Sequence, residues 1–185
     1  MNFYISDWHY NHANCIRFDP RPFATVEEMN TALISRWNQT VTREDTVYIL
    51  GDMFWCNNNA AVPVLEQLNG TKYLIRGNHD ICKLPEFLNQ FQQISEYMEI
   101  KDGPHNLVLC HYPIPCFKNH MYGWIHLYGH VHTSPEYEVV LQTQQNLIKR
   151  MEAPCEMYNV GAMLPYIDYM PRTLHEIRAQ MSSIL

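Results

Sequence analysis

The sequence predicts an α/β fold in which buried parallel strands alternate with amphipathic helices. Short apolar runs that are rich in branched and aromatic residues recur along the chain, and helical patterns lie between them. Several of these runs end abruptly in Gly or in polar residues. A strand, a helix and a second strand in this order favour a parallel pair with a right-handed crossover.

The first third of the chain predicts a strand, a helix and a strand. The strands are expected at residues 3–6 and 46–50, where apolar residues are continuous. Between them, Thr25 and Glu28 have the spacing of a capping box, and a set of apolar residues follows at helical spacing: Met29, Leu33 and Trp37. This helix is expected to cover the sheet with its apolar face.

The middle of the chain continues the alternation. We expect a short helix at residues 60–68, limited by Pro63, and another at 85–92. Further strands are expected at residues 72–76, 94–100, 106–110 and 124–128. Residues 137–141 are followed by a polar, Gln-rich stretch that we expect to be a loop, then by the run 157–161 and by a last helix that begins at Thr173.

Polar residues gather where these strands end. Five separate strands are followed by a His, an Asp or an Asn, and residues two apart on an extended chain face the same way. In open α/β sheets, sites form beyond the carboxyl ends of strands. These side chains are imidazoles and oxygen donors with no thiolate, which suits a pair of divalent transition ions better than a structural zinc site. They are Asp7, His9, Asp52, Asn78, His79, His111, His130 and His132.

Composition argues against several classes of protein. The 185 residues suffice for one domain with a sizeable core, expected to span 1–185, and we expect neither a spanning segment nor a secretory leader. The six cysteines form no CxxC pair and are expected to be reduced. A net charge of -6 without a basic cluster argues against extended nucleic-acid binding. We therefore expect a cytoplasmic protein without a membrane partner, whose oligomeric state the sequence does not define.

The ordered set of strand-end motifs resembles the calcineurin-like metallophosphoesterases, especially their small stand-alone bacterial and phage members. The motifs are Asp7-x-His9, Gly51-Asp52, Gly77-Asn78-His79-Asp80, His111 and Gly129-His130-x-His132. The resemblance implies a four-layer α/β sandwich of two mixed β-sheets flanked by helices, with metal ions at the loop edge. The segment Met53-Phe54-Trp55 lacks the acid and the Arg that the Ser/Thr protein phosphatases have there, which disfavours that branch.

The resemblance also implies roles for the motif residues. One ion would be held by Asp7, His9, Asp52 and His132, and the other by Asp52, Asn78, His111 and His130, so that Asp52 bridges the two. The ions would be Mn, Fe, Zn, Ni or Co. The implied reaction is in-line attack on a small phosphodiester or phosphomonoester, such as a nucleotide-like ester, by a metal-bridging hydroxide, with His79 as the acid.

Other residues near the motifs are candidates for contacts with substrate. Arg21 could clamp a phosphate, and His12 could touch the substrate, although each has a structural alternative in its loop. Asp80 could act in catalysis by orienting His79, or could cap the segment after it. Aromatic residues beside the motifs, such as Trp55 and Tyr112, could stack on a base. Two alternatives to a small-molecule phosphoesterase stay open at this point: a non-catalytic metal-binding scaffold of the same fold, and a nuclease.

Overall fold

The computed structural model describes residues 1–181, which contain two four-stranded sheets. The first sheet has the order β1-β2-β3-β4 and is entirely parallel: β1 Asn2–Ile5, β2 Thr46–Ile49, β3 Thr71–Ile75 and β4 Gln93–Ser95. The second has the order β5-β6-β7-β8, and its only antiparallel pair among the described residues is β5 with β6: β5 Tyr97–Asp102, β6 His105–Cys110, β7 Ile125–Tyr128 and β8 Glu156–Asn159.

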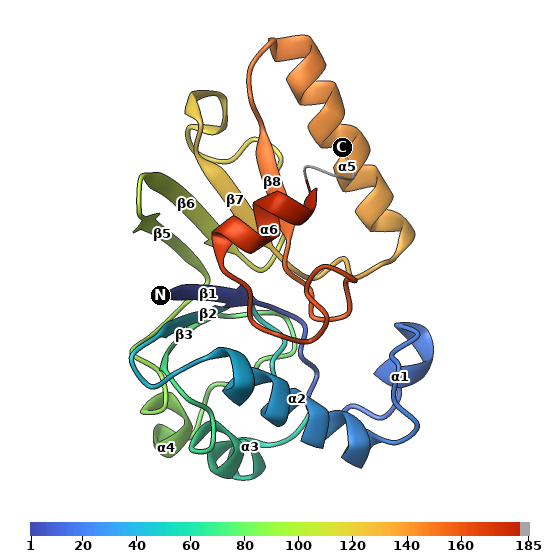
Figure 1. The fold of residues 1–185 in the computed structure, drawn as a ribbon, viewed down its shortest axis with the longest axis vertical. Coiled ribbons are helices and arrows are strands. Elements are labelled where there is room, and N and C mark those ends of the chain that lie inside the picture. Colours follow the sequence, from blue (N-terminus) through green and yellow to red (C-terminus); the bar gives the residue numbers. More distant parts are fainter. Residues whose placement is uncertain (182–185) are drawn as a thin grey trace.

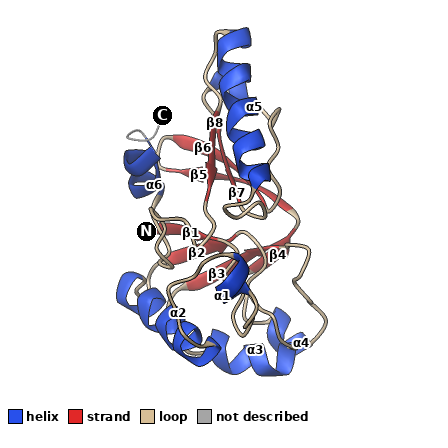
Figure 2. Ribbon diagram, turned by 90° about the vertical axis from the view of Figure 1, so that its right-hand side faces the viewer, coloured by secondary structure: helices blue, strands red, loops and turns tan. Residues whose placement is uncertain are grey.

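Helices cover the outer faces of the two sheets (Figures 1 and 2). The first sheet is covered by α2 (Val26–Thr40), α3 (Asn58–Leu65) and α4 (Pro85–Leu88), and the second by α5 (Pro135–Met151). The last helix, α6 (Leu174–Met181), lies beside both sheets, while α1 (Cys15–Phe18) and a 3-10 turn at His120–Tyr122 belong to loops. The expected sandwich of two sheets flanked by helices is confirmed, although only the second sheet is mixed.

The helix predicted after Thr25 illustrates how sequence leads to structure here. The Thr25 hydroxyl accepts the backbone N–H of Glu28, which satisfies one of the free donors in the first turn of α2. The apolar residues at helical spacing are buried in the main core against the first sheet, and they are Met29, Leu33 and Trp37. The predicted helix and its core-facing side are therefore confirmed.

Two predictions about secondary structure are wrong. The run 94–100 is not one strand, because β4 ends at Ser95 and β5 begins at Tyr97 in the other sheet, so that the chain passes between sheets at this point. The Gln-rich stretch is not a loop but most of α5. Its N-cap is Ser134, with Pro135 in the first turn, and Gln144 is buried and donates to the Cys155 carbonyl.

Parallel pairing determines where the site lies. Because β1, β2 and β3 run the same way, their carboxyl ends meet at one edge, and β6 and β7 are also parallel to each other. None of the helices within residues 1–181 has the length and apolar character needed to cross a membrane. The six cysteines all fall in this part of the chain and are free thiols, as expected.

Candidate metal centre

The loops after β1 and β2 lie side by side and are joined by backbone hydrogen bonds. The N–H of Asp7 donates to the Gly51 carbonyl, and the N–H of His9 donates to the Asp52 carbonyl, both at 3.0 Å. This pairing continues the strand register past the ends of the strands. It therefore brings the first two ligand motifs together at one edge of the sheet.

A first group of donors consists of Asp7, His9 and His132. The Nε2 atoms of His9 and His132 lie 3.2 Å apart, and Nε2 of His132 lies 3.3 Å from Oδ1 of Asp7. Asp7 is fully buried, and His9 is nearly so. Residues that are distant in sequence thus converge through atoms that could bind a metal ion.

A second group consists of Asp7, Asp52 and His111. Nε2 of His111 lies 3.5 Å from Oδ2 of Asp52 and 3.2 Å from the side-chain oxygen of Asn78. Nδ1 of the same ring is 2.7 Å from the Leu50 carbonyl, which makes Nδ1 the protonated nitrogen and leaves Nε2 facing the two oxygens. The predicted neutral ligand, Asn78, therefore lies next to this group.

Asp7 is the carboxylate common to the two groups that the described residues form. The bridging role of Asp52 stays a prediction, because it depends on how ions are held. His130 belongs to neither group by its ring, which lies with its centroid 5.1 Å from that of His111 and 4.7 Å from that of Tyr112. Its backbone N–H instead donates to the carboxylate of Asp7.

The backbone of the ligand loops is strained. Non-glycine residues rarely have a positive φ, and each such position costs of order 1–3 kcal/mol. At this site, residues of three motifs have a positive φ, between 47° and 70°. They are Asp7, His9, Asp52, His130 and His132. The surrounding fold holds these loops in conformations that an isolated chain would avoid, which is typical of functional sites.

Two motif glycines are required by close approach to the carboxylates. A Cβ on Gly77 would collide with the side chain and the backbone nitrogen of Asp52. A Cβ on Gly129 would collide with the Ser6 hydroxyl and the Asp7 carboxylate. The glycines of the third and fifth motifs thus make room for the acids of the second and first motifs.

Asp80 ties two ligand loops together. Its buried carboxylate accepts the backbone N–H groups of Asp52, Met53 and Gly77 at 2.9, 3.0 and 2.9 Å. The oxygens of Asp80 are occupied by these backbone donors, and a catalytic role of Asp80 through orienting His79 stays a prediction. Its hydrogen bonds hold together the loops that carry Asp52 and His79.

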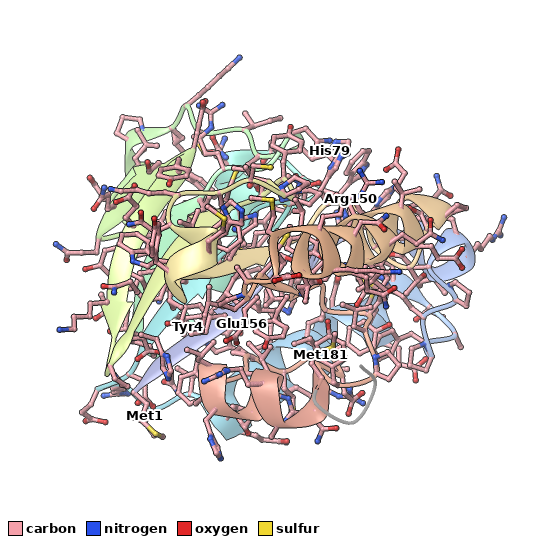
Figure 3. The ribbon with its side chains drawn as sticks, turned by 90° about the horizontal axis from the view of Figure 1, so that it is seen from above. Met1, Tyr4, His79, Arg150, Glu156 and Met181 are labelled. Atoms are coloured by element: carbon pink, nitrogen blue, oxygen red, sulfur yellow. The ribbon has the colours of Figure 1, made fainter. Side chains whose placement is uncertain are left out.

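The imidazole of His79 is open to solvent beside the buried donors, with its side chain 40% exposed. Its Nε2 lies 3.9 Å from Oδ2 of Asp52, and its backbone N–H donates to Oδ1 of the same residue. In the view of Figure 3, the labelled His79 and Met181 at the end of α6 lie on opposite sides of the molecule. His79 is therefore accessible from solvent, unlike the buried donors beside it.

The donor atoms fit cations. In the neutral form of His132, Nδ1–H donates to the Asp19 carboxylate and Nε2 presents a lone pair toward Nε2 of His9 and Oδ1 of Asp7. Lone pairs that face one another across about 3 Å repel unless a proton or a metal ion lies between them. His111 meets two oxygens in the same way. The two groups have the nitrogen and oxygen donors that divalent transition metals bind.

Comparison with known proteins identifies the family. The model of the calcineurin-like phosphoesterases matches residues 3–154, which include every predicted metal ligand. The chain belongs to the calcineurin-like phosphoesterase family. The resemblance seen in the strand-end motifs is thereby confirmed.

The chain is also similar to individual proteins in sequence and in fold. The chain is 42% identical over 132 residues to the uncharacterized protein MJ1445 of Methanocaldococcus jannaschii, a match that covers 70% of this chain and 68% of the relative. It is 35% identical over 81 residues to the Gene 66 protein of Mycobacterium phage L5, covering 42% of this chain and 38% of that protein. The fold is that of a protein of unknown function, AQ665 from Aquifex aeolicus, with a TM-score of 0.69, 24% identity and coverage of 100% and 99% of the two chains.

Charges within the candidate metal centre strongly shift the pKa values of its residues. Burial lowers the pKa of His132, but its bonds to Asp19 and Asp7 outweigh burial and raise it to about 10. Burial raises the pKa of Asp7, but His132 lowers it more, so that the net pKa lies below the usual range. Burial lowers the pKa of His9 to about 3. In the absence of a metal ion, a proton is therefore held at His132 and excluded from Asp7 and His9.

Arg21 has a structural place in this site. Its side chain is 0% exposed, and its guanidinium donates to the carbonyls of Asp7 and Trp8 at 2.9 and 2.8 Å and to the carboxylate of Asp19. A buried guanidinium with these partners faces the protein, so the prediction that it clamps a phosphate is corrected. Arg21 instead holds the loop that contains Asp7 and His9.

Asp19 was not predicted from the sequence. Its carboxylate lies 2.6 Å from Nδ1 of His132 and 2.9 Å from Arg21. The available signal was the pair Asp19-x-Arg21 in the loop after the first motif, because a carboxylate partner commonly orients a metal-binding histidine. His12, the other predicted substrate contact, is buried and stacks on Trp55.

Proposed function

We propose that this calcineurin-like phosphoesterase is a dinuclear metal-dependent enzyme that hydrolyses a small phosphodiester or phosphomonoester. The observation that carries the proposal is the convergence of two donor groups that share the carboxylate of Asp7. Asp7, His9 and His132 would hold one ion. Asp52, Asn78, His111 and His130 would complete the second site, with Asp52 or Asp7 shared.

Two divalent ions bound here would supply Lewis acidity, both to a water that they share and to the oxygens of a phosphoryl group. The chain supplies the orientation of the donors through backbone hydrogen bonds and the bond from His132 to Asp19. Only Asp7 and Asp52 bring formal negative charge to the two donor groups. These two carboxylates would not cancel the charge of two dications, so the loaded site would attract a phosphate although the whole protein carries a charge of -6.

We assign to His79 the role of proton donor to the leaving oxygen, and its exposure beside the buried donors supports this role. It is exposed while its neighbours are buried, and Asp52 lies on one side of its ring. The His79 ring would donate a proton to the leaving oxygen, on which negative charge develops during ester cleavage. General acid catalysis of this kind typically raises the rate by about 10²–10⁴-fold. The role of His79 does not require it to bind metal.

A cytoplasmic location and a small phosphate-ester partner belong to the same proposal. The free thiols of the described chain agree with a reducing compartment. An extended nucleic-acid partner is disfavoured by the acidic balance of the sequence.

The test is turnover after reconstitution with Mn, Fe, Co, Ni or Zn, using a bis(nitrophenyl) phosphodiester and a nitrophenyl monoester. Bound metal is measured on the same samples. We expect hydrolysis with at least one metal, abolished by Asp52→Asn and retained by Asp102→Asn, whose carboxylate contacts Tyr4 and Asn2 instead. Bound metal without hydrolysis of either ester would favour the non-catalytic scaffold.

A further inference from the structure

A pocket of about 440 Å³ opens beside the metal centre. Pockets that hold small ligands commonly have volumes of this order and combine apolar walls with a few polar groups. Here the walls come from the loop after β2 and the loop after β3. The lining residues are Phe54, Trp55, Cys56, Asn78, His79 and Ile81.

Trp55 forms a flat wall of this pocket. One face of its indole is covered by the His12 ring, at a centroid distance of 3.9 Å and an interplanar angle of 7°. Trp55 is nevertheless 43% exposed. Because the covered face contributes little to that exposure, the opposite face and the edges are the surfaces that Trp55 presents to the pocket.

The indole is held before any ligand arrives. His12 is itself buried, and its ring lies with its centroid 5.5 Å from those of His9 and Phe18. Trp55 also meets His79 at 4.6 Å in a tilted arrangement. A platform that is already ordered loses little conformational freedom when a ligand binds.

The pocket combines polar and apolar lining residues. Among the polar ones, Asn78 contacts His111, and His79 lies beside Asp52. Among the apolar ones, Ile81 is 52% exposed although it is a large aliphatic residue. An ester with its phosphate at the metal centre would therefore extend its organic group between Trp55 and Ile81.

We propose that this pocket binds a planar aromatic group of the substrate, so that the enzyme acts on aryl or nucleoside phosphate esters. The inference rests on the proposed phosphoesterase function and names the substrate class of that site. Aromatic rings stack on indole with a gain that depends on planarity, whereas a flexible aliphatic chain gains only from burial. The flat Trp55 wall thus selects for planar groups.

The test compares phosphonates, whose carbon–phosphorus bond a phosphoesterase does not cleave. Binding of methylphosphonate, cyclohexylphosphonate and phenylphosphonate to the metal-loaded protein is measured by calorimetry. The three share one metal-binding group and differ in size and planarity. We expect phenylphosphonate to bind on the order of tenfold more tightly than methylphosphonate, and cyclohexylphosphonate to bind more weakly than phenylphosphonate.

Substitutions in the pocket test whether its residues cause the preference for phenylphosphonate. Trp55→Ala should abolish the preference for phenylphosphonate over methylphosphonate, with a larger loss of affinity for the phenyl compound than for the methyl compound. Trp55→Phe should retain most of this preference. Tyr122→Ala is the matched control, since Tyr122 is an exposed aromatic residue that does not line this pocket. Circular dichroism of each variant, and Ile81→Ala as a second change in the same wall, guard against a folding defect in one variant.

The outcomes separate this inference from the proposed function. Three results would overturn the aromatic pocket, even if Asp52-dependent hydrolysis is observed. They are equal affinities for phenylphosphonate and methylphosphonate, equal losses of affinity for the two compounds in Trp55→Ala, and no binding of phenylphosphonate. A phenyl preference that Trp55→Ala removes would support the pocket even if no ester is hydrolysed. A nucleoside phosphonate that binds more tightly than phenylphosphonate would identify the planar group as a nucleobase.

Discussion

The carboxylate of Asp19 lies 2.6 Å from Nδ1 of His132, across 113 positions of sequence. Asp19 also accepts from Arg21, whose guanidinium donates to the carbonyls of Asp7 and Trp8. One buried ion pair therefore connects the loop of the first motif with the loop of the last. The ligands of the first donor group depend on this connection for their orientation.

Asp19→Asn should weaken metal binding by about 10- to 100-fold, because the amide no longer holds the His132 ring as a carboxylate does. Metal affinity is measured by competition with a chelator, on protein shown by circular dichroism to be folded. Asp45→Asn is the control, since Asp45 is another buried carboxylate whose partners are Thr42 and the N-terminal amine. Equal losses in the two variants would argue against a positioning role for Asp19.

Arg21→Met should lower the free energy of unfolding by about 3–5 kcal/mol, because it leaves the buried carboxylate of Asp19 without its cationic partner. The change is measured by urea denaturation. Arg76→Met should cost less than about 1 kcal/mol, since Arg76 pairs with Glu96 at the surface at 3.5 Å. Unchanged stability together with a raised KM in Arg21→Met would instead make Arg21 a substrate contact.

Asn78→Ala and His79→Ala should have different effects although the residues are adjacent. Asn78 lies beside His111 within the second donor site, so its loss should reduce bound metal. His79→Ala should keep the metal and lower kcat by roughly 10²–10⁴-fold. Metal content and turnover measured on the same samples distinguish the two, and loss of metal from His79→Ala would contradict the separate roles.

His126 should make stability depend on pH. It is fully buried, its Nδ1 contacts the Val108 carbonyl, and its Nε2 accepts the N–H of Ile114, while burial lowers its pKa to about 4. The unfolded chain takes up the proton near pH 6.5. The stabilisation from neutral His126 is therefore complete above that pH and is lost as the pH falls toward 4.

Between pH 6.5 and about pH 5, this residue should account for a loss of about 2 kcal/mol in the free energy of unfolding. His126→Asn keeps a donor toward Val108 without a titrating ring, so its stability should fall less over the same range. Denaturant unfolding at several pH values measures the difference. The same substitution at His175, an exposed residue of α6, should leave the pH dependence as it is in the wild type.

The strand-end motifs could be found in the sequence because they depend on local patterns. Apolar runs that end in Gly-Asp, Gly-Asn-His or Gly-His identify strands and their carboxyl ends, and parallel pairing gathers those ends at one edge. The helix after Thr25 is equally local, since its cap and its apolar spacing lie within one continuous segment, Val26–Thr40 and the residue before it. Family, fold class and candidate ligands followed from such patterns.

Other features depended on contacts between distant parts of the chain. The run 94–100 is continuous in hydrophobicity, yet the chain leaves one sheet and enters the other within it. The helix α5 was missed because its polar Gln residues outweighed the start signal of Ser134 and Pro135, and the burial of Gln144 depends on a carbonyl of Cys155. Local periodicity carries no information about such partners.

The sequence by itself determined which residue types stand at the strand ends, because a strand ends where its apolar pattern ends. Only the tertiary structure decided what each of them contacts. Asp80 turned out to accept backbone N–H groups, Arg21 to be buried under the first loop, and Asp7 to belong to both donor groups. The physical reason is that these contacts depend on the paths of loops at positive φ, which are held by packing and hydrogen bonds from elsewhere in the fold.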